Sequence, residues 1–251
     1  YQLTIKKNFV AVVTDGSAVL GLGNIGALAG LPVMEGKCLL FKRFANIDAI
    51  PICIQSQDAE VIIQTVKNIA PTFGGINLED ISAPRCFEIE NRLIDELNIP
   101  VFHDDQHGTA VVALAGMINA FKLTGRQFAA ARFVFSGSGA AGVAVAKMLM
   151  SYGAVDIIIC DSKGIIHEGR DHLDVSKQQI AKITNRSNLT GTLADALKQA
   201  DVFIGLSAAG LLTTELVKAM KPDPVIFAMA NPTPEIMPDE AKKAGVRLIA
   251  T

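Results

Sequence analysis

Two short acidic segments follow apolar runs that are typical of buried β-strands. Glu79 and Asp80 come directly after "GGINL", and Asp104 and Asp105 come directly after "PVFH". If these strands are neighbours in a parallel sheet, the four carboxylates gather at one edge, where they would repel and raise each other's pKa values. A divalent cation removes that repulsion, and oxygen ligands suit Mg²⁺ or Mn²⁺. The two acidic pairs together therefore predict a metal site.

Two other interpretations of the acidic pairs stay open. His103 and His107 flank the aspartates and would suit zinc, although the lack of nearby cysteine and the excess of carboxylate favour a harder ion. Alternatively, Asp80 and Asp105 each cap the N-terminus of a following helix, a role that needs no metal.

A lysine lies in an otherwise apolar, helix-like segment earlier in the chain. Lys37 follows Glu35 and Gly36, and the next lysine, Lys42, lies beyond "CLLF". A lysine among apolar residues with carboxylates nearby can have a finely set pKa and act as a base. The spacing by itself favours the simpler alternative, which is a solvent-exposed lysine.

A glycine-rich turn joins the apolar segment "RFVFS" to a helical pattern. The first glycine of such a turn allows a tight bend, the second lets a pyrophosphate approach the backbone, and the third lets helix and strand pack closely. Free N–H groups at the start of the helix would then face the phosphates. The pattern predicts a dinucleotide site, and the alternative is a turn kept for packing alone. The turn consists of Gly137, Ser138, Gly139, Ala140, Ala141 and Gly142.

Later strand ends supply further candidates for the same nucleotide site. "DIIICD" ends at Asp161, where an acid would bind the ribose hydroxyls and repel a 2′-phosphate, which favours NAD. Ser162 and Lys163 could instead serve the phosphate of NADP, so NADP stays possible. Ser207 and Asn231 follow two further strands and are expected to contact cofactor or substrate. For Asn231, the alternative is a simple Asn-Pro turn.

The elements that must position these residues are short apolar strands alternating with helical patterns. Strands that are apolar on both faces, with helices between them, predict parallel sheets covered on both sides. We predict an α/β fold of two units, 1–126 and 127–251, divided where a long helical pattern ends in Gly125. The second unit is expected to be a Rossmann-like, doubly wound parallel sheet. Strands are predicted at 9–14, 49–54, 75–78, 100–103, 132–137, 156–161, 201–206, 225–230 and 246–250.

Composition and net charge bear on the kind of partner that the protein binds. Half of the 251 residues are apolar, 19% are charged, and the net charge is −2. This gives no support for nucleic acid or an anionic membrane as a partner. No apolar run reaches the roughly 18 residues of a membrane span, and no signal peptide is visible. The four cysteines are scattered in apolar settings, which favours reduced core thiols in a cytoplasmic protein.

Six segments together resemble the malic enzymes in their compact bacterial form. The resemblance implies oxidative decarboxylation of L-malate to pyruvate and CO₂ with reduction of NAD(P), by a homodimer or larger homo-oligomer. It implies that Glu79, Asp80 and Asp105 hold Mg²⁺ or Mn²⁺. Lys37 would be the general base for the C2 hydroxyl, and Asp104 would set its protonation. In order along the chain, the segments are "VVTDGSAVLGLGNIG", "PVMEGKCLLFK", "FGGINLEDISAP", "PVFHDDQHGTA", "GSGAAG" and "ANPTPE".

The chain also departs from the family pattern. The family's general-acid tyrosine, in a motif like "YTPG", is absent, and so is a downstream substrate-binding Asn-Asn motif. The chain starts at Tyr1 without a methionine and stops at Thr251 after a predicted strand. We therefore expect the first domain (malate and metal binding) to lack an N-terminal part and the second (NAD(P) binding) to lack a C-terminal part. Where animal forms carry an arginine for the substrate carboxylate, this chain has Ser17-Ala18-Val19, so another group must bind that carboxylate.

Two alternative functions stay open. A malolactic enzyme, which converts malate to lactate and keeps its NAD bound, would share most of these motifs. A non-catalytic nucleotide-binding homologue would need only the glycine-rich turn. The cluster of carboxylates around Lys37 argues against this second alternative, because a protein without the chemistry has no reason to maintain so costly a group of charges.

Overall fold

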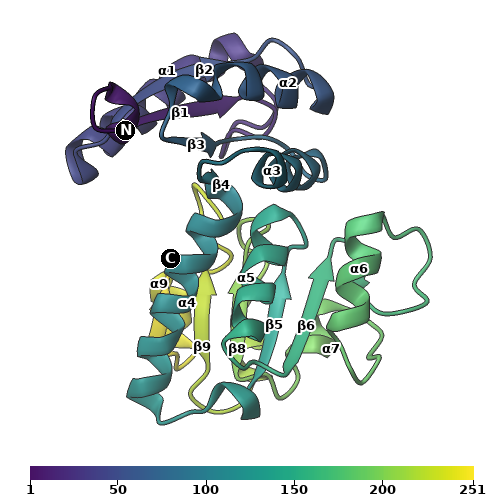
Figure 1. Ribbon diagram of the computed structural model, residues 1–251. Helices are drawn as coiled ribbons and strands as arrows, with labels where there is room; N and C mark the ends of the chain where they lie inside the picture. Colours follow the sequence, from purple (N-terminus) through teal and green to yellow (C-terminus); the bar gives the residue numbers. More distant parts are fainter. The chain divides into compact units, whose positions relative to one another are not determined.

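The computed structural model describes residues 1–251 and divides into two compact units, Tyr1–Gly108 and Thr109–Thr251 (Figure 1). The sequence placed this division at 126/127. The difference arises from helix α4 (Asp104–Thr124), which begins in the first unit and packs in the core of the second through Ala113, Met117 and Phe121. Most of this helix therefore belongs to the second unit.

The first unit is a four-stranded parallel sheet in the order β2-β1-β3-β4. Helix α1 packs on β1 and β2, and α2 packs against α3. Because all four strands are parallel, the chain leaves them at one edge of the sheet. The elements are η1 (Ile5–Asn8), β1 (Phe9–Thr14), α1 (Gly26–Ala45), β2 (Asp48–Cys53), α2 (Ala59–Ile69), η2 (Ala70–Thr72), β3 (Gly75–Leu78), α3 (Arg85–Glu96) and β4 (Val101–His103).

The second unit is a six-stranded sheet in the order β10-β9-β8-β5-β6-β7. Its strands are parallel except β7, a two-residue antiparallel strand that the sequence did not predict. The order reverses at β5, as in a doubly wound sheet. The remaining elements are η3 (Phe128–Ala130), β5 (Arg132–Ser136), α5 (Ala140–Ser151), β6 (Asp156–Asp161), β7 (Gly164–Ile165), α6 (Val175–Ile183), α7 (Leu193–Leu197), β8 (Val202–Gly205), α8 (Thr214–Lys218), β9 (Val225–Ala228), α9 (Pro238–Lys243) and β10 (Leu248–Ala250).

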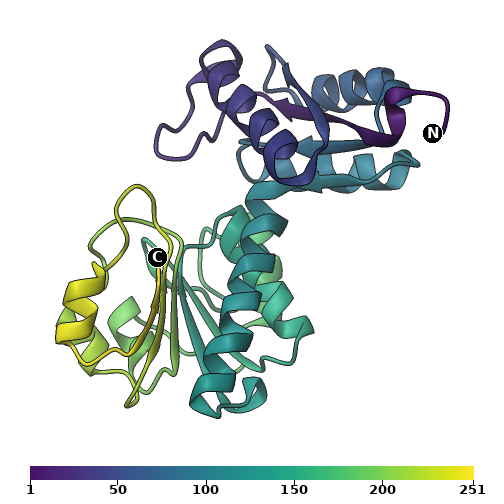
Figure 2. The ribbon, with the colours of Figure 1, turned by 90° about the vertical axis from the view of Figure 1, so that its left-hand side faces the viewer.

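Both faces of the second sheet are covered, which explains why the central positions of its strands are apolar on both faces. Phe133 and Phe135 point into a core shared with α4, α5 and α6. Val134, between them, points into the opposite core with α7, α8 and α9. Figure 2 shows this arrangement, with α4 on one side of the sheet and α9 on the other. The predicted fold class, α/β with a Rossmann-like second sheet, is confirmed.

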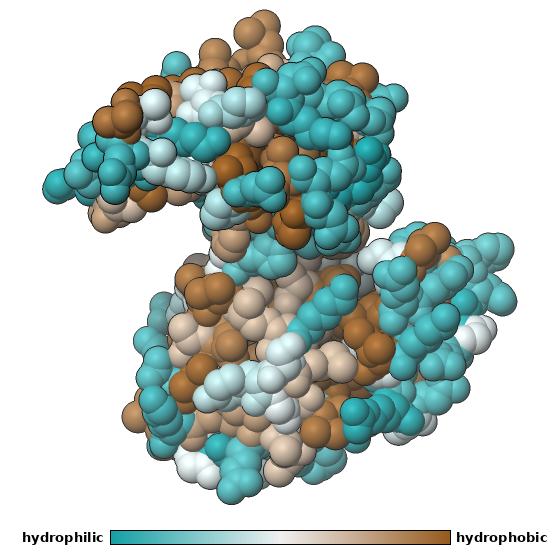
Figure 3. Space-filling model, in the orientation of Figure 1, coloured by the Kyte–Doolittle hydropathy of each residue, from teal (hydrophilic) through white to brown (hydrophobic).

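Small residues let the helices approach this sheet closely. A Cβ added at Gly116 of α4 would lie 2.8 Å from the ring of Phe227 on β9. In Figure 3 much of the surface over α4 and α5 is white to brown, with teal side chains between, whereas the surface around α6 is mostly teal. No helix is both long enough and apolar enough to cross a membrane. All four cysteines are free thiols.

Candidate functional site

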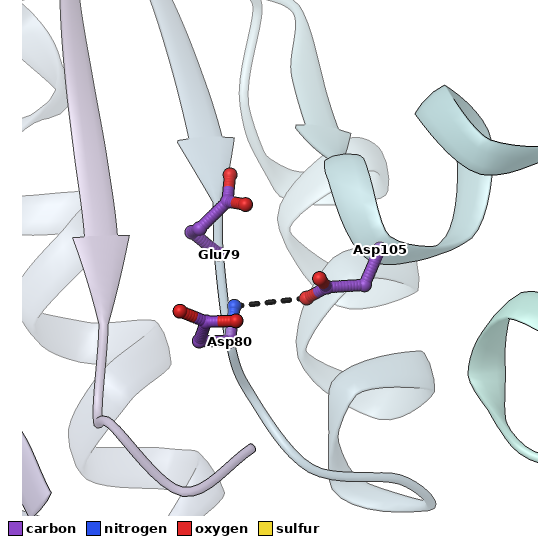
Figure 4. Close-up of side chains that lie close together, drawn as sticks. All are labelled: Glu79, Asp80 and Asp105. Carbon is purple, nitrogen blue, oxygen red and sulfur yellow. Dashed lines mark hydrogen bonds between the residues drawn. The ribbon is translucent and has the colours of Figure 1, made fainter. Parts of the chain in front are cut away.

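The predicted acidic pairs meet in the first unit because β3 and β4 are neighbours. Leu78 at the end of β3 pairs with His103 at the end of β4. Glu79 and Asp80 follow β3 directly, and Asp105 lies in the first turn of α4. One carboxylate oxygen from each of these three residues lies within 4.8 Å of the others (Figure 4). The predicted metal ligands therefore converge.

The backbone at Asp80 is fixed in an unusual conformation. Its φ is +54°, a left-handed value that non-glycine residues adopt rarely. Its backbone N–H donates a 2.8 Å hydrogen bond to Oδ2 of Asp105. Asp80 and Asp105 do not cap the helices that follow them. Pro84 occupies the N-cap position of α3, and Asp105 lies inside α4. The two acids contact each other's segments instead.

Burial and mutual repulsion act on all three carboxylates. Burial, followed by the charges of Asp105 and Glu79, raises the pKa of Asp80 to about 7. Burial also raises the pKa values of Glu79 and Asp105, although Lys37 opposes both shifts. Asn77 donates a 2.8 Å hydrogen bond to Glu79 Oε2 and fixes that side chain. Three crowded, half-desolvated carboxylates form a donor set that fits a hard divalent cation.

Lys37 of α1 lies beside this acidic group and is not the exposed lysine that its spacing favoured. Its Nζ lies 2.5 Å from Asp104 Oδ2 and 3.0 Å from Glu79 Oε2, and its side chain is 23% exposed. Burial lowers the Lys37 pKa, but Asp104 and Glu79 outweigh burial and leave the pKa raised. Asp104 and Asp105 thus divide their contacts, with Asp104 facing Lys37 and Asp105 facing Asp80.

The two histidines on which the zinc alternative depended, His103 and His107, are not part of the group of converging carboxylates. His103 is fully buried, and its pKa is lowered to about 4, first by burial and also by His107, so its ring is neutral. His103 Nε2 lies 3.4 Å from Asp105 Oδ2, and neither ring nitrogen has a hydrogen-bond partner. His107 Nε2 lies 2.8 Å from Oε1 of Glu90, a buried residue of α3. The converging ligands are carboxylates alone.

Arg85 is a residue that sequence reasoning missed. Its Nη2 donates hydrogen bonds to Asp15 Oδ2 (2.8 Å) and to Ser17 Oγ (2.9 Å), in the loop after β1. Gly16 in this loop has a φ of +68°, and an added Cβ would lie 2.2 Å from the carbonyl oxygen of Gly26. These contacts give the "TDGS" segment a fixed shape. Arg85 follows the acidic motif "EDISAP", but no spacing rule would have paired it with Asp15.

The glycine-rich turn of the second unit has the geometry of a dinucleotide site. Added Cβ atoms would lie 2.5 Å from Leu206 O at Gly137, whose φ is +121°, and 2.2 Å from Gly137 O at Gly142. At Gly139, the N-cap of α5, an added Cβ would meet nothing within 4 Å. The protein's own packing thus explains the first and third glycines. Packing does not explain the second glycine, Gly139. The close approach of a pyrophosphate to its backbone would explain it.

A cavity of about 700 Å³ opens at the carboxyl ends of β5, β6 and β8. This volume lies within the ordinary range for small-molecule sites. Gly137, Ser138, Asp161 and Ser207 line the cavity, so four of the predicted nucleotide residues share one site. The other lining residues are Ser136, Cys160, Ser162, Lys163, Gly164, Thr192, Leu193, Ala208 and Leu211.

Asp161 is held by two cations that the sequence did not reveal. Arg170 contacts both carboxylate oxygens, at 3.0 Å and 2.5 Å, and Lys177 Nζ lies 3.1 Å from Oδ2. Burial would raise the Asp161 pKa, but Arg170, the Lys163 backbone N–H and Lys177 outweigh it and lower the pKa to about 2. Asp161 is therefore a fixed negative charge. Neither cation lines the cavity, so both contact Asp161 from outside it.

A buried carboxylate organises the two later strand ends. Glu235 is fully buried and accepts hydrogen bonds from the backbone N–H groups of Ser207 (2.9 Å) and Ala230 (3.1 Å). The hydroxyls of Ser207 and Ser136 lie 2.8 Å apart. Asn231 is exposed, immediately beyond this arrangement. Glu235 is a further residue that sequence reasoning missed, although it ends the "ANPTPE" motif.

The first of the two α/β units holds a candidate cation site, and the second holds a glycine-rich turn beside a cavity. The family model described as "Malic enzyme, NAD binding domain" matches residues 106–246, and "Malic enzyme, N-terminal domain" matches residues 2–61 and 55–94. The chain belongs to the malic enzyme family.

Individual relatives agree with this assignment. The chain is 57% identical over its whole length to a bifunctional malic/malolactic enzyme of Bacillus subtilis, of which it covers 62%. It is 51% identical over 97% of its length to an NADP-dependent malic enzyme of Halomonas elongata, of which it covers 57%. The crystal structure of an NAD-dependent malic enzyme from Thermotoga maritima matches all of this chain with a TM-score of 0.98 and 52% identity, and the match covers 67% of that chain. The chain thus spans about three fifths of the length of these curated relatives.

Proposed function

We propose that the protein of which this chain is part oxidises L-malate to pyruvate and CO₂ while reducing NAD(P) in the presence of Mg²⁺ or Mn²⁺. The observation that carries the proposal is the contact of Lys37 with Asp104 and Glu79, beside the converging carboxylates of Asp80 and Asp105. A potential base and a potential cation site therefore lie in one unit, within contact distance of each other.

In the proposed reaction, Glu79, Asp80 and Asp105 hold the divalent cation. When bound, the cation would supply Lewis-acid stabilisation for negative charge on the C2 oxygen of the substrate. The charge of a bound cation would oppose the carboxylates that raise the Lys37 pKa, and Lys37 Nζ would then take the proton of the C2 hydroxyl as hydride leaves C2 for the nicotinamide ring. The C4 carboxyl then departs as CO₂, and C3 gains a proton to give pyruvate. Asp104, at 2.5 Å from Lys37 Nζ, would orient the amine and influence its protonation.

For the cofactor, we propose the glycine-rich turn of Gly137 to Gly142 as the pyrophosphate site and Asp161 as the acceptor for the ribose hydroxyls. NAD is the expected preference, because the Asp161 carboxylate can accept hydrogen bonds from ribose hydroxyls but offers no donor to a 2′-phosphate. Ser162 and Lys163 line the same cavity and keep NADP possible. We further propose contacts of Ser207 and Asn231 with cofactor or substrate.

The test uses the full-length protein with L-malate and Mn²⁺ and follows the absorbance of reduced nicotinamide with NAD and with NADP. Pyruvate is assayed in parallel. Reduced cofactor and pyruvate appearing together, and both disappearing on addition of EDTA, are the expected result. Lactate formation without net cofactor reduction would identify the malolactic reaction, for which the name of the Bacillus subtilis relative is the supporting observation. No consumption of malate would contradict both.

The family also leads us to propose a cytoplasmic homo-oligomer, a dimer or larger. Sedimentation of the full-length protein would test the assembly, and a monomer would contradict it.

A further inference from the structure

Glu90 of α3 is a buried carboxylate with no role in the proposed chemistry. It is 3% exposed, yet both of its oxygens are engaged. Oε1 accepts a 2.8 Å hydrogen bond from the backbone N–H of His103, and Oε2 accepts a 3.0 Å bond from Gln106 Nε2. The ring nitrogen Nε2 of His107 lies 2.8 Å from Oε1. All three partners belong to one short segment, residues 103–107.

This segment carries the two aspartates of the candidate site. Asp104 contacts Lys37, and Asp105 accepts the backbone N–H of Asp80 at 2.8 Å. Glu90 contacts the residue before this pair and the residues after it, but neither aspartate itself. The Glu90 side chain therefore holds segment 103–107 on both sides of the two aspartates, whose side chains point in different directions.

These hydrogen bonds matter because the candidate site depends on the orientation of its carboxylates as well as on their presence. Removing a group that orients metal ligands by hydrogen bonds typically changes metal affinity or activity by about 10- to 100-fold. If Glu90 lost its charge, the His103 N–H and the Gln106 amide would both compete for a weaker acceptor inside the protein, where unpaired donors are unfavourable. The turn would then shift, and the two carboxylates would shift with it.

We propose that Glu90 is a positioning residue that sets the direction of Asp104 toward Lys37 and of Asp105 toward the cation site. The inference rests on the proposed function for its catalytic consequence, but its consequence for cation binding stands on the geometry alone. Glu90 acts only through the segment 103–107 and touches neither substrate nor cation.

The experiment compares Glu90→Gln with Glu88→Gln in the full-length protein. Glu88 lies on the same helix but is exposed, so the second variant makes the same chemical change without touching the turn. Mn²⁺ affinity is measured with the metal alone, by electron paramagnetic resonance of the free ion. NAD affinity, kcat, KM for malate and the thermal midpoint are measured on the same samples.

We expect Glu90→Gln to weaken Mn²⁺ binding by about 10- to 100-fold and to lower kcat, with NAD affinity unchanged. Glu88→Gln should match the wild type. If Glu90→Gln lowers only the thermal midpoint, while Mn²⁺ affinity and kcat below the transition stay at wild-type values, Glu90 is merely structural and the proposal is wrong. Should Glu90→Gln fail to fold, Gln106→Met removes a single donor, and a smaller loss of Mn²⁺ affinity in the same direction is expected.

The failure of this inference can be told apart from failure of the proposed function. A wild type that binds Mn²⁺ but leaves malate unchanged, together with weakened Mn²⁺ binding in Glu90→Gln, would support the positioning role and contradict the reaction. A wild type that binds no Mn²⁺ would contradict both.

Discussion

The two units each place a candidate site where parallel strands end, but they build these sites from different materials. In the first unit, charged side chains come from α1, from the segment after β3 and from the first turn of α4. In the second unit, the turn proposed for the pyrophosphate supplies backbone groups and glycines from one continuous segment, Gly137 to Gly142. A site of dispersed side chains depends on every element that aims them. A site of contiguous backbone depends mainly on the absence of side-chain atoms.

The largest expected effect separates the chemistry from nucleotide binding. Lys37→Ala removes the proposed base, and general acid–base catalysis typically contributes about 10²–10⁴-fold to a rate. We expect kcat to fall by about that factor while NAD affinity stays unchanged, since the nucleotide residues belong to the other unit. Steady-state kinetics and calorimetric NAD titration measure the two quantities.

Lys42→Ala is the matched control for this prediction. Lys42 lies on the same helix, is 54% exposed and pairs with Asp48 away from the acidic group. Its variant should keep the wild-type kcat. Equal losses in the two variants would mean that Lys37 has no special role.

The next test exploits the different reasons for two glycines of one turn. Gly139→Ala adds a Cβ that meets no protein atom, so stability should hold while NAD affinity falls. Losing one charge-assisted hydrogen bond to the pyrophosphate, at about 1.5–3 kcal/mol, predicts a loss of about 10- to 100-fold. Gly142→Ala instead brings a Cβ to 2.2 Å from the carbonyl oxygen of Gly137 and should lower stability by about 1–3 kcal/mol.

Thermal unfolding measures the stability of both variants, and titration with NAD measures their affinity for it. If Gly139→Ala binds NAD as tightly as the wild type, no pyrophosphate approaches that backbone, and the assignment of the turn is wrong.

The contrast between the sites also explains what the sequence revealed. The glycine-rich turn could be recognised because its residues are adjacent and each has a fixed steric task. The acidic pairs could be placed because neighbouring parallel strands end together. Glu90 and Arg170 could not be found, because which buried carboxylate meets which donor is decided by packing between elements. The polar residues of "HDDQHG" likewise concealed the start of α4 at Asp104, which the sequence pattern predicted only from Thr109 onward.

A smaller effect is expected from Gly108→Ala, which changes the orientation of the Asp104 carboxylate. An added Cβ at Gly108 would lie 2.1 Å from Asp104 Oδ1, so Gly108→Ala must push that carboxylate away from Lys37. Alanine also favours a helix over glycine by about 1 kcal/mol, so stability should be equal or higher. We expect kcat to fall by about tenfold, which corresponds to about 1.4 kcal/mol in the barrier, with NAD affinity unchanged.

Gly36→Ala is its control, because Gly36 lies next to Lys37 on α1 and an added Cβ there meets nothing within 4 Å. Kinetics and thermal unfolding are measured on both variants. Full activity in Gly108→Ala would show that the contact of Asp104 with Lys37 is dispensable.

The last comparison concerns how each site changes the stability of the folded protein with pH. The pKa of Asp161 is lowered to about 2, because Arg170, the Lys163 N–H and Lys177 outweigh burial. Its contribution to stability is present above about pH 4 and is lost as pH falls toward 2. The pKa of Asp80 is raised to about 7 by burial and by its acidic neighbours. Its contribution is present below about pH 4 and is lost as pH rises toward 7 when no divalent cation is bound.

The two carboxylates should therefore give slopes of opposite sign, which single substitutions can separate. Urea unfolding in EDTA is followed across this pH range for the wild type, Asp161→Asn and Asp80→Asn. Asp161→Asn should remove part of the loss of stability below pH 4, and Asp80→Asn should remove part of the loss between pH 4 and 7. Adding Mn²⁺ should restore stability near neutral pH in the wild type but not in Asp80→Asn, because binding to the folded state stabilises it. If Asp80→Asn leaves the wild-type loss of stability between pH 4 and 7 unchanged, the acidic group does not carry the mutual repulsion that a divalent cation would relieve.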